Sequence, residues 1–209
     1  MQMFLTKWAG KALNGLLARE SRTSTRSRCT CGGPANSEES QVFRCYDCHV
    51  SPLYCRDCIL KSHERTPFHQ VEHWDNQRGF WRRHPLTDLE VVLHLGHPGG
   101  QCEFAHTSAR KMKVVSDNGI HSVGVRFCQC RDTVTGETTP EATQLLREGF
   151  WPASWEQPAT AFTIQSLKTF SLLANQANVN AYDYFETLRR KTDGVAPHDV
   201  SVSCSGQTV

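Results

Sequence analysis

Eight potential metal ligands lie close together near the start of the chain, and they constrain its fold more than any other feature. They form four pairs: Cys29 and Cys31, Cys45 and Cys48, Cys55 and Cys58, and His63 and His69. A structural zinc ion takes four Cys or His ligands, and Cys-x2-Cys steps followed by His are a typical spacing. The eight ligands therefore predict two zinc ions bound within residues 29–75.

The spacing permits two arrangements of these ligands. Neighbouring pairs can share an ion, or alternate pairs can cross over. The second pair is the least certain, because Asp47 can replace Cys48 as a ligand and His49 is adjacent. A disulfide framework is the alternative use of the cysteines. It requires an oxidising compartment, and no secretory signal indicates one.

Residues 44–74, RCYDCHVSPLYCRDCILKSHERTPFHQVEHW, resemble the cross-braced B-box zinc fingers. In that family the first and third ligand pairs share one ion, and the second and fourth pairs share the other. The resemblance therefore favours the crossover arrangement. It implies one zinc held by Cys29, Cys31, Cys55 and Cys58, and a second held by Cys45, Cys48, His63 and His69.

Composition and charge limit the rest of the chain. With 209 residues, of which 38% are apolar, we expect one or two small domains with modest cores, so bound metal must supply part of the stability. No apolar run approaches the ~20 residues of a membrane helix, and we expect a soluble protein. Residues 1–28 have a net charge of +5, in a chain whose total is +2. A basic arm suits nucleic-acid phosphates, although solvated surface charge is the commoner explanation.

The first segment, residues 1–28, is predicted to be an amphipathic helix over residues 3–19 followed by a basic linker. Its Arg and Ser content and its lack of acidic residues before Glu20 also fit a mitochondrial presequence. A helix that docks ahead of the zinc module is the simpler interpretation. After the finger, Trp74, Phe80 and Trp81 either stack on bases or, as we expect, plug the finger against the next unit.

Residues 76–139 are predicted to form a small three-stranded antiparallel sheet. Apolar and polar residues alternate from Leu89 to Leu95, and two more strands lie at about 111–116 and 120–127. Asp117-Asn118-Gly119 between the last two predicts a hairpin, because Asn-Gly tolerates positive φ. This role is sufficient for Asp117, which we therefore do not assign as a catalytic acid.

A third zinc site is predicted at the ends of this sheet, with ligands His97, Cys102, Cys128 and Cys130. In a simple meander the first and third strands run in the same direction, so their C-terminal ends share an edge. His121 at the opposite end and His106 in a loop are rival fourth ligands. Buried thiols without metal are the alternative.

Residues 140–194 are predicted to be helical. A short helix starts near Pro140 and stops at Gly149, an aromatic loop follows, and a helical hairpin begins near Thr160, with Asn180 capping its second helix. Residues 195–209 are expected to be a disordered tail with Cys204 as a free thiol. The expected fold class is a small, zinc-stabilised α+β protein, in which a B-box-like cross-braced finger precedes the sheet and the helical hairpin.

Together, residues 4–194 resemble the CxC2 cysteine-cluster region that precedes the catalytic domain of the Kyakuja-Dileera-Zisupton (KDZ) transposases of fungal genomes. The resemblance rests on the finger and on four further segments: LTDLEVVLHLGHPGGQC, VVSDNGIHSVGVRFCQC, QLLREGFWPAS and TAFTIQSLKTFSLLANQANVNAYDYFETLRRKTDG. It implies descent from a DNA transposon and zinc-dependent binding of DNA or a protein partner. The resemblance also implies nuclear localisation, and the basic N-terminal segment gives the mitochondrion as the alternative.

In these transposases the catalytic core is ribonuclease-H-like and follows the region matched here. We therefore expect a zinc-binding, non-catalytic N-terminal fragment of a KDZ-type transposase. A B-box-type protein-interaction scaffold linked to ubiquitin ligation is the alternative, but RING cysteine pairs and a long heptad helix are missing from the sequence. An enzyme with a Cys nucleophile is disfavoured, because a zinc-bound thiolate is consumed by its metal.

Overall fold

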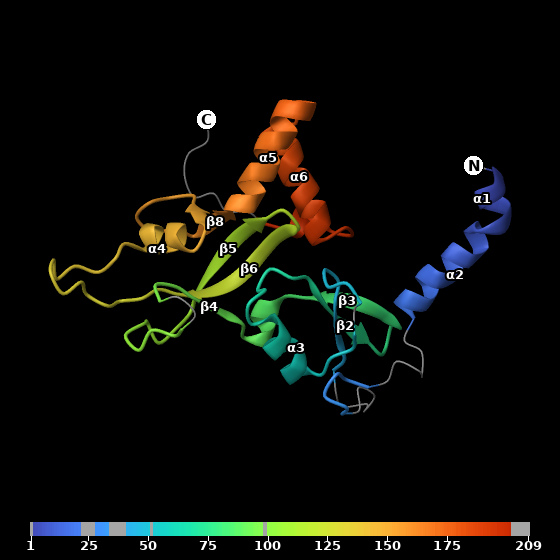
Figure 1. Ribbon diagram of the computed structural model, residues 1–209, viewed down its shortest axis with the longest axis horizontal. Coiled ribbons are helices and arrows are strands. Elements are labelled where there is room, and N and C mark those ends of the chain that lie inside the picture. The colour runs from blue at the N-terminus through green and yellow to red at the C-terminus, as the bar shows by residue number, and fades with distance from the viewer. Residues whose placement is uncertain (1, 22–27, 34–40, 51, 98–99, 202–209) are drawn as a thin grey trace. The chain divides into compact units, whose positions relative to one another are not determined.

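The computed structural model describes residues 2–21, 28–33, 41–50, 52–97 and 100–201 (Figure 1). The chain forms two compact units, Met1–Pro85 and Leu86–Val209. Each unit combines helices with a β-sheet, so the predicted small α+β class is confirmed. No helix among the described residues is long and apolar enough to cross a membrane. The prediction for Cys204 lies outside the described residues.

The first unit begins with the predicted amphipathic helix, which forms in two pieces, α1 (Gln2–Lys7) and α2 (Ala9–Glu20). Its apolar face does not dock as we expected, because α2 buries no residue. Its contacts with the rest of the unit include an ion pair and a hydrogen bond. The Glu20 carboxylate pairs with the Arg44 guanidinium, and the Trp81 Nε1–H donates to the Glu20 carbonyl over 3.2 Å.

A three-stranded antiparallel sheet with strand order β1-β2-β3 forms the centre of this unit. Its elements are β1 (Phe43–Cys45), α3 (Arg56–His63), β2 (Val71–Asp75) and β3 (Phe80–His84). Trp74 and Trp81 pack against Val42 and Leu53, so they fill the core of this unit itself. Because β3 pairs with β2 along its whole length, the unit extends to Pro85.

The second unit contains a five-stranded mixed sheet with strand order β4-β6-β5-β8-β7. Its strands are β4 (Val92–His94), β5 (Arg110–Ser116), β6 (Gly119–Arg126), β7 (Phe150–Pro152) and β8 (Thr160–Thr163). The predicted β5–β6 hairpin is confirmed, and Ser116 pairs with Gly119.

The predicted three-stranded meander is wrong for this unit. β4 pairs in parallel with β6, and β8 occupies the other side of β5, also in parallel. The long connection between β4 and β5 allows this crossover, because a tight turn between them would enforce antiparallel pairing. β4 also starts later than predicted, since Leu89 lies in the 3-10 helix η1 (Leu86–Leu89) and Glu90 has a φ of 66°.

The predicted helices of this unit form, with altered boundaries. They are α4 (Glu141–Arg147), α5 (Ile164–Ala177) and α6 (Ala181–Thr192). As predicted, Asn180 caps α6 by accepting from the Asp183 N–H over 2.9 Å. Tyr184 and Leu188 of α6 are buried, whereas Tyr182 is 72% exposed.

The segment from Gly149 to Thr163 was predicted as a loop and the start of a helix, and it contains β7 and β8 instead. Thr163 caps α5 by accepting from the Ser166 N–H over 3.1 Å, so the helix starts after the strand. The tail contains a short 3-10 helix, η2 (Pro197–Asp199), and is therefore structured within residues 195–201. Residues 202–209 lie outside the described part.

Candidate metal centres

Three groups of Cys and His side chains bring four potential ligand atoms each within 4.8 Å of one another. The first cluster is Cys29, Cys31, Cys55 and Cys58, the second is Cys45, Cys48, His63 and His69, and the third is His97, Cys102, Cys128 and Cys130. With Zn–S bonds of about 2.3 Å, sulfur atoms of a tetrahedral site lie roughly 3.8 Å apart. Each cluster can therefore hold a metal ion.

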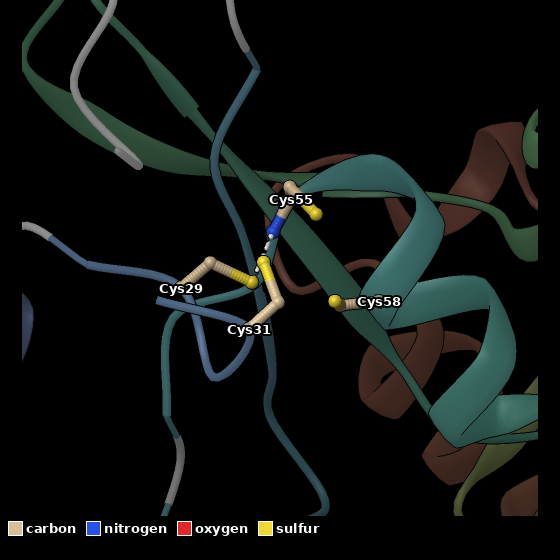
Figure 2. Close-up of side chains that lie close together, drawn as sticks. All are labelled: Cys29, Cys31, Cys55 and Cys58. Atoms are coloured by element: carbon tan, nitrogen blue, oxygen red, sulfur yellow. Dashed lines mark hydrogen bonds between the residues drawn. The ribbon is translucent and has the colours of Figure 1, made fainter. Parts of the chain in front are cut away.

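The first cluster joins a turn to the start of α3 (Figure 2). The turn closes by hydrogen bonds from the Cys29 N–H to the Gly33 carbonyl and from the Gly32 N–H to the Cys29 carbonyl. Gly32 has a φ of 82°, which favours glycine. Cys55 caps α3 and Cys58 lies in its first turn, so the helix turns both thiols toward Cys29 and Cys31.

Backbone N–H groups stabilise the thiolate of Cys29. Burial raises the pKa of this thiol, but the N–H groups of Cys31 and Cys55, together with the side chains of Cys31 and Thr30, outweigh that effect and the pKa falls to about 6. The Cys55 N–H lies 3.2 Å from the Cys29 Sγ. Because zinc binds thiolates, a lowered pKa favours metal over proton at this sulfur at neutral pH.

The second cluster lies between β1, α3 and the loop that enters β2. The Cys45 and Cys48 Sγ atoms each lie 3.4 Å from the His69 Nδ1, and the Cys48 Sγ lies 3.6 Å from the His63 Nε2. These separations suit a tetrahedral ion with S and N ligands, for which about 3.5 Å is expected. Burial raises the pKa of Cys45 to about 12, so this thiol is ionised only when a cation binds beside it.

Contacts around His63 select its metal-binding nitrogen. Its Nδ1 lies 3.0 Å from the Ile59 carbonyl and 2.8 Å from the Ser62 Oγ. Donation from Nδ1–H to the carbonyl leaves Nε2 with a free lone pair facing Cys48. Metal-ligating histidines in proteins are held in this way by a partner on the other ring nitrogen.

Asp47 and His49, considered above as substitutes for Cys48, do not belong to the second cluster. The Asp47 carboxylate accepts from the Gln70 N–H over 2.6 Å, which holds the loop beside His69. Its role is therefore to fix the approach of the chain to β2. The nine cysteines within the described residues form no disulfide.

The third cluster lies where β4 and β6 end. Because these strands are parallel neighbours, their C-terminal ends meet at one edge of the sheet and bring His97 to Cys128 and Cys130. The His97 Nε2 lies 3.2 Å from the Cys128 Sγ and 3.4 Å from the Cys130 Sγ. The Cys102 Sγ lies 3.5 Å from both sulfurs.

The rival histidines lie elsewhere. His121 is held at the hairpin end of β6, where its Nε2 lies 2.9 Å from the Asn118 Oδ1. His106 is exposed and belongs to none of the three clusters. The third cluster thus lies at the predicted edge of the sheet. The two strands that end at this edge are direct parallel neighbours, not the outer strands of a meander.

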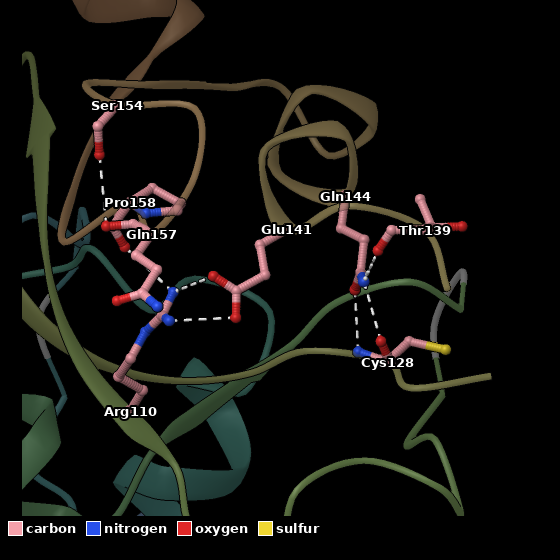
Figure 3. Close-up of polar contacts among 8 residues, drawn as sticks. All are labelled: Arg110, Cys128, Thr139, Glu141, Gln144, Ser154, Gln157 and Pro158. Atoms are coloured by element: carbon pink, nitrogen blue, oxygen red, sulfur yellow. Dashed lines mark hydrogen bonds and ion pairs between the residues drawn. The ribbon is translucent and has the colours of Figure 1, made fainter. Parts of the chain in front are cut away.

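Two residues that sequence reasoning missed hold Cys128 in place. Gln144, which is only 1% exposed, accepts from the Cys128 N–H and donates to the Cys128 carbonyl, both over 2.9 Å (Figure 3). Its Nε2 also donates to the Thr139 carbonyl over 2.8 Å. Gly96 has a φ of 95°, and a Cβ there would lie 2.3 Å from the Cys128 Cβ. This closeness allows His97 to reach the cysteines.

We expect Gln144→Leu to weaken metal binding at the third cluster by about 10–100-fold, the usual effect of losing a supporting contact. It leaves the N–H and carbonyl of Cys128 buried without partners, at about 1–3 kcal/mol for each group. Competition with a zinc chelator measures the affinity. Gln129→Leu, the same change at a half-buried neighbour of Cys128, is the control. Equal affinities of the two variants would show that the Gln144 contacts do not support the cluster.

Comparison with known proteins agrees with this arrangement. The family model of a CxC2-like cysteine cluster associated with KDZ transposases matches residues 86–196, which is more than half of the chain and includes the third cluster. The match does not extend over residues 4–85, where the resemblance was also expected. No curated protein and no solved structure matches the chain. The chain belongs to the family of CxC2-like cysteine clusters associated with KDZ transposases.

Proposed function

We propose that the chain is a zinc-binding module of a KDZ-type transposase, with one zinc ion in each of the three clusters. The observation that carries this proposal is the grouping of twelve Cys and His side chains into three sets of four. Four soft or imidazole ligands are the donor set of structural zinc. A bound ion would supply cross-links between elements that have small apolar cores.

The first two clusters have the ligand order of a B-box-like cross-braced finger. Along the chain their ligand pairs alternate: the first cluster takes the first and third pairs, and the second takes the second and fourth. Helix α3 contributes Cys58 to one cluster and His63 to the other. The alternative proposal, a B-box-type scaffold linked to ubiquitin ligation, rests on this alternation, and a ubiquitin-transfer assay tests it.

The module acts, in our proposal, as a non-catalytic N-terminal part of the transposase. Each cluster consists of Cys and His only, and four protein ligands leave no open coordination position for water or substrate. Strand transfer by two divalent ions instead requires carboxylate ligands. The module therefore serves recognition, which implies a nuclear location.

DNA is the partner we favour over a protein. The association of the family with transposases supports this choice, as does the net charge of +5 over residues 1–28. Counterion release makes such binding depend steeply on salt. A protein partner remains the second candidate, because B-box-like fingers are interaction modules.

Native mass spectrometry of the purified chain, with and without chelator, tests the metal proposal. We expect three zinc ions per chain and their loss with chelator. Fluorescence anisotropy with labelled DNA over a salt series then tests recognition, and we expect affinity to fall as salt rises and to disappear without zinc. A metal count below three would remove at least one site. Binding that is independent of salt would contradict the electrostatic account.

A further inference from the structure

The strands of the five-stranded sheet are basic and contain no acidic residue. β4 to β8 include Arg110, Lys111, Lys113 and Arg126, together with two histidines. Arg110 is neutralised, because its guanidinium forms a bidentate ion pair with Glu141 of α4 (Figure 3). The other three form no ion pair with a described acidic residue.

Register and alternation place these three cations on the face opposite Arg110. Lys111 pairs with Gly124, Lys113 pairs with Ser122, and Arg126 pairs with His94. Paired residues share a face of a sheet, and successive residues alternate between faces. We call the surface formed by Lys111, Lys113, Ser122, Arg126 and His94 the basic face.

Helix α6 covers the far end of this side of the sheet. There Tyr184 and Leu188 pack against Val115 and Ile120. Lys113 lies two residues before Val115 on β5, and Lys111 lies a further two residues away, so both are beyond that core. Lys111 is exposed and Lys113 is partly exposed.

Two polar atoms of the basic face lack a hydrogen-bond partner in the part of the chain that the structure describes. The Ser122 Oγ and the Arg126 Nε are buried and make no hydrogen bond within the described residues. Neither lysine forms an ion pair with a described acidic residue. Burial, followed by the charge of Lys111, lowers the pKa of Lys113, so the two ammonium groups repel each other. The ammonium groups of Lys111 and Lys113, which are exposed and partly exposed, fit an anion with several oxygen acceptors.

An aromatic pair extends the same side of the sheet. Trp151 of β7 pairs with Phe162, which pairs with Val115, and therefore lies on the side of the basic face. It is 47% exposed and meets Trp155, which is 60% exposed, edge to face at 6.1 Å. Trp151 lies two strands away from Lys113 across the sheet and two residues away along the strand direction. This offset places their Cα atoms roughly 12 Å apart.

We propose that this surface binds an unpaired nucleic-acid strand, with phosphates on the basic face and a base stacked on Trp151. Cations that follow the backbone next to an exposed aromatic side chain are the usual elements of single-strand recognition. An acidic protein would satisfy the charges but would make no use of the exposed indole. The proposal rests on the proposed function, because it requires that the module recognise nucleic acid. It adds a binding surface on the second unit to the basic segment of residues 1–28.

Fluorescence anisotropy of the zinc-loaded full chain with a labelled oligothymidine tests this surface. We expect Lys111→Gln with Lys113→Gln to weaken binding at least tenfold at low salt and to reduce the slope of log K against log salt by about 1.4, for two lost phosphate contacts. Trp151→Ala should weaken binding by on the order of tenfold with an unchanged slope. The zinc count of each variant checks its fold.

The matched control is Arg147→Gln with Lys168→Gln, which removes the same charge from exposed positions on α4 and α5. Its affinity should equal that of the wild type. If both double variants weaken nucleic-acid binding equally, the loss of net charge explains the effect and the proposed surface is wrong. Normal binding by the basic-face variant would overturn the surface but leave nucleic-acid recognition standing. A wild type that binds no nucleic acid overturns both this surface and the choice of DNA as the partner. Preference for duplex DNA or for polyglutamate overturns the unpaired strand as ligand.

Discussion

Cys58→Ser should remove both zinc ions of the first unit and unfold it, lowering the metal count from three to one. Cys58 belongs to the first cluster, but its helix α3 also contributes His63 to the second. Loss of one ion therefore releases the helix that the other ion needs. Structural zinc contributes an apparent ~10–16 kcal/mol at small fingers, which is comparable with the whole stability of a domain.

Native mass spectrometry and amide hydrogen exchange of α3, β2 and β3 measure this effect. Cys130→Ser is the matched control, because it removes a thiol from the third cluster and should lower the count by one without changing exchange in the first unit. If Cys58→Ser retains two ions and a protected β2–β3 hairpin, the two clusters are independent. A retained count of three would exclude Cys58 as a ligand.

How far the sequence predicts this protein depends on the range of the interactions involved. The spacing of Cys55, Cys58 and His63 is local, and one helix brings all three to their clusters. The β5–β6 hairpin and the Asn180 cap were likewise predictable from adjacent residues. The pairing of β4 with β6 depends on a long connection whose path no local pattern specifies.

The supporting residues of the third cluster were missed for a different reason. Gln144 lies in a short helix, where a glutamine is ordinarily solvated, and only the tertiary fold reveals that it is buried against Cys128. Strands β7 and β8 have three and four residues, too few to show an alternation. The glycine in Leu95-Gly96-His97 offered one signal, since an isolated glycine beside a strand often marks a close backbone approach.

Gly96→Ala is therefore expected to destabilise the second unit by about 3 kcal/mol or more and to abolish metal binding at the third cluster. The new Cβ would lie 2.3 Å from the Cys128 Cβ and 3.0 Å from the Gln144 Oε1, while the φ of 95° is strained for any residue with a side chain. Overpacking costs about 1–3 kcal/mol, and a left-handed conformation adds about 1–2 kcal/mol. Relief of the clash must move Cys128 away from the Gln144 amide and from His97.

Gly136→Ala separates the two causes. Gly136 also has a positive φ, of 68°, but apart from its chain neighbours no described residue has a heavy atom within 4 Å of the position of its Cβ, so only the conformational cost of about 1–2 kcal/mol applies. Hydrogen exchange of β5 and β6 measures the stability of the unit, and the zinc count reports the cluster. Gly136→Ala should retain all three ions. If Gly96→Ala also retains all three ions and loses a similar amount of stability, backbone strain alone explains its effect. In that case the close packing of Gly96 on Cys128 does not hold the third cluster together.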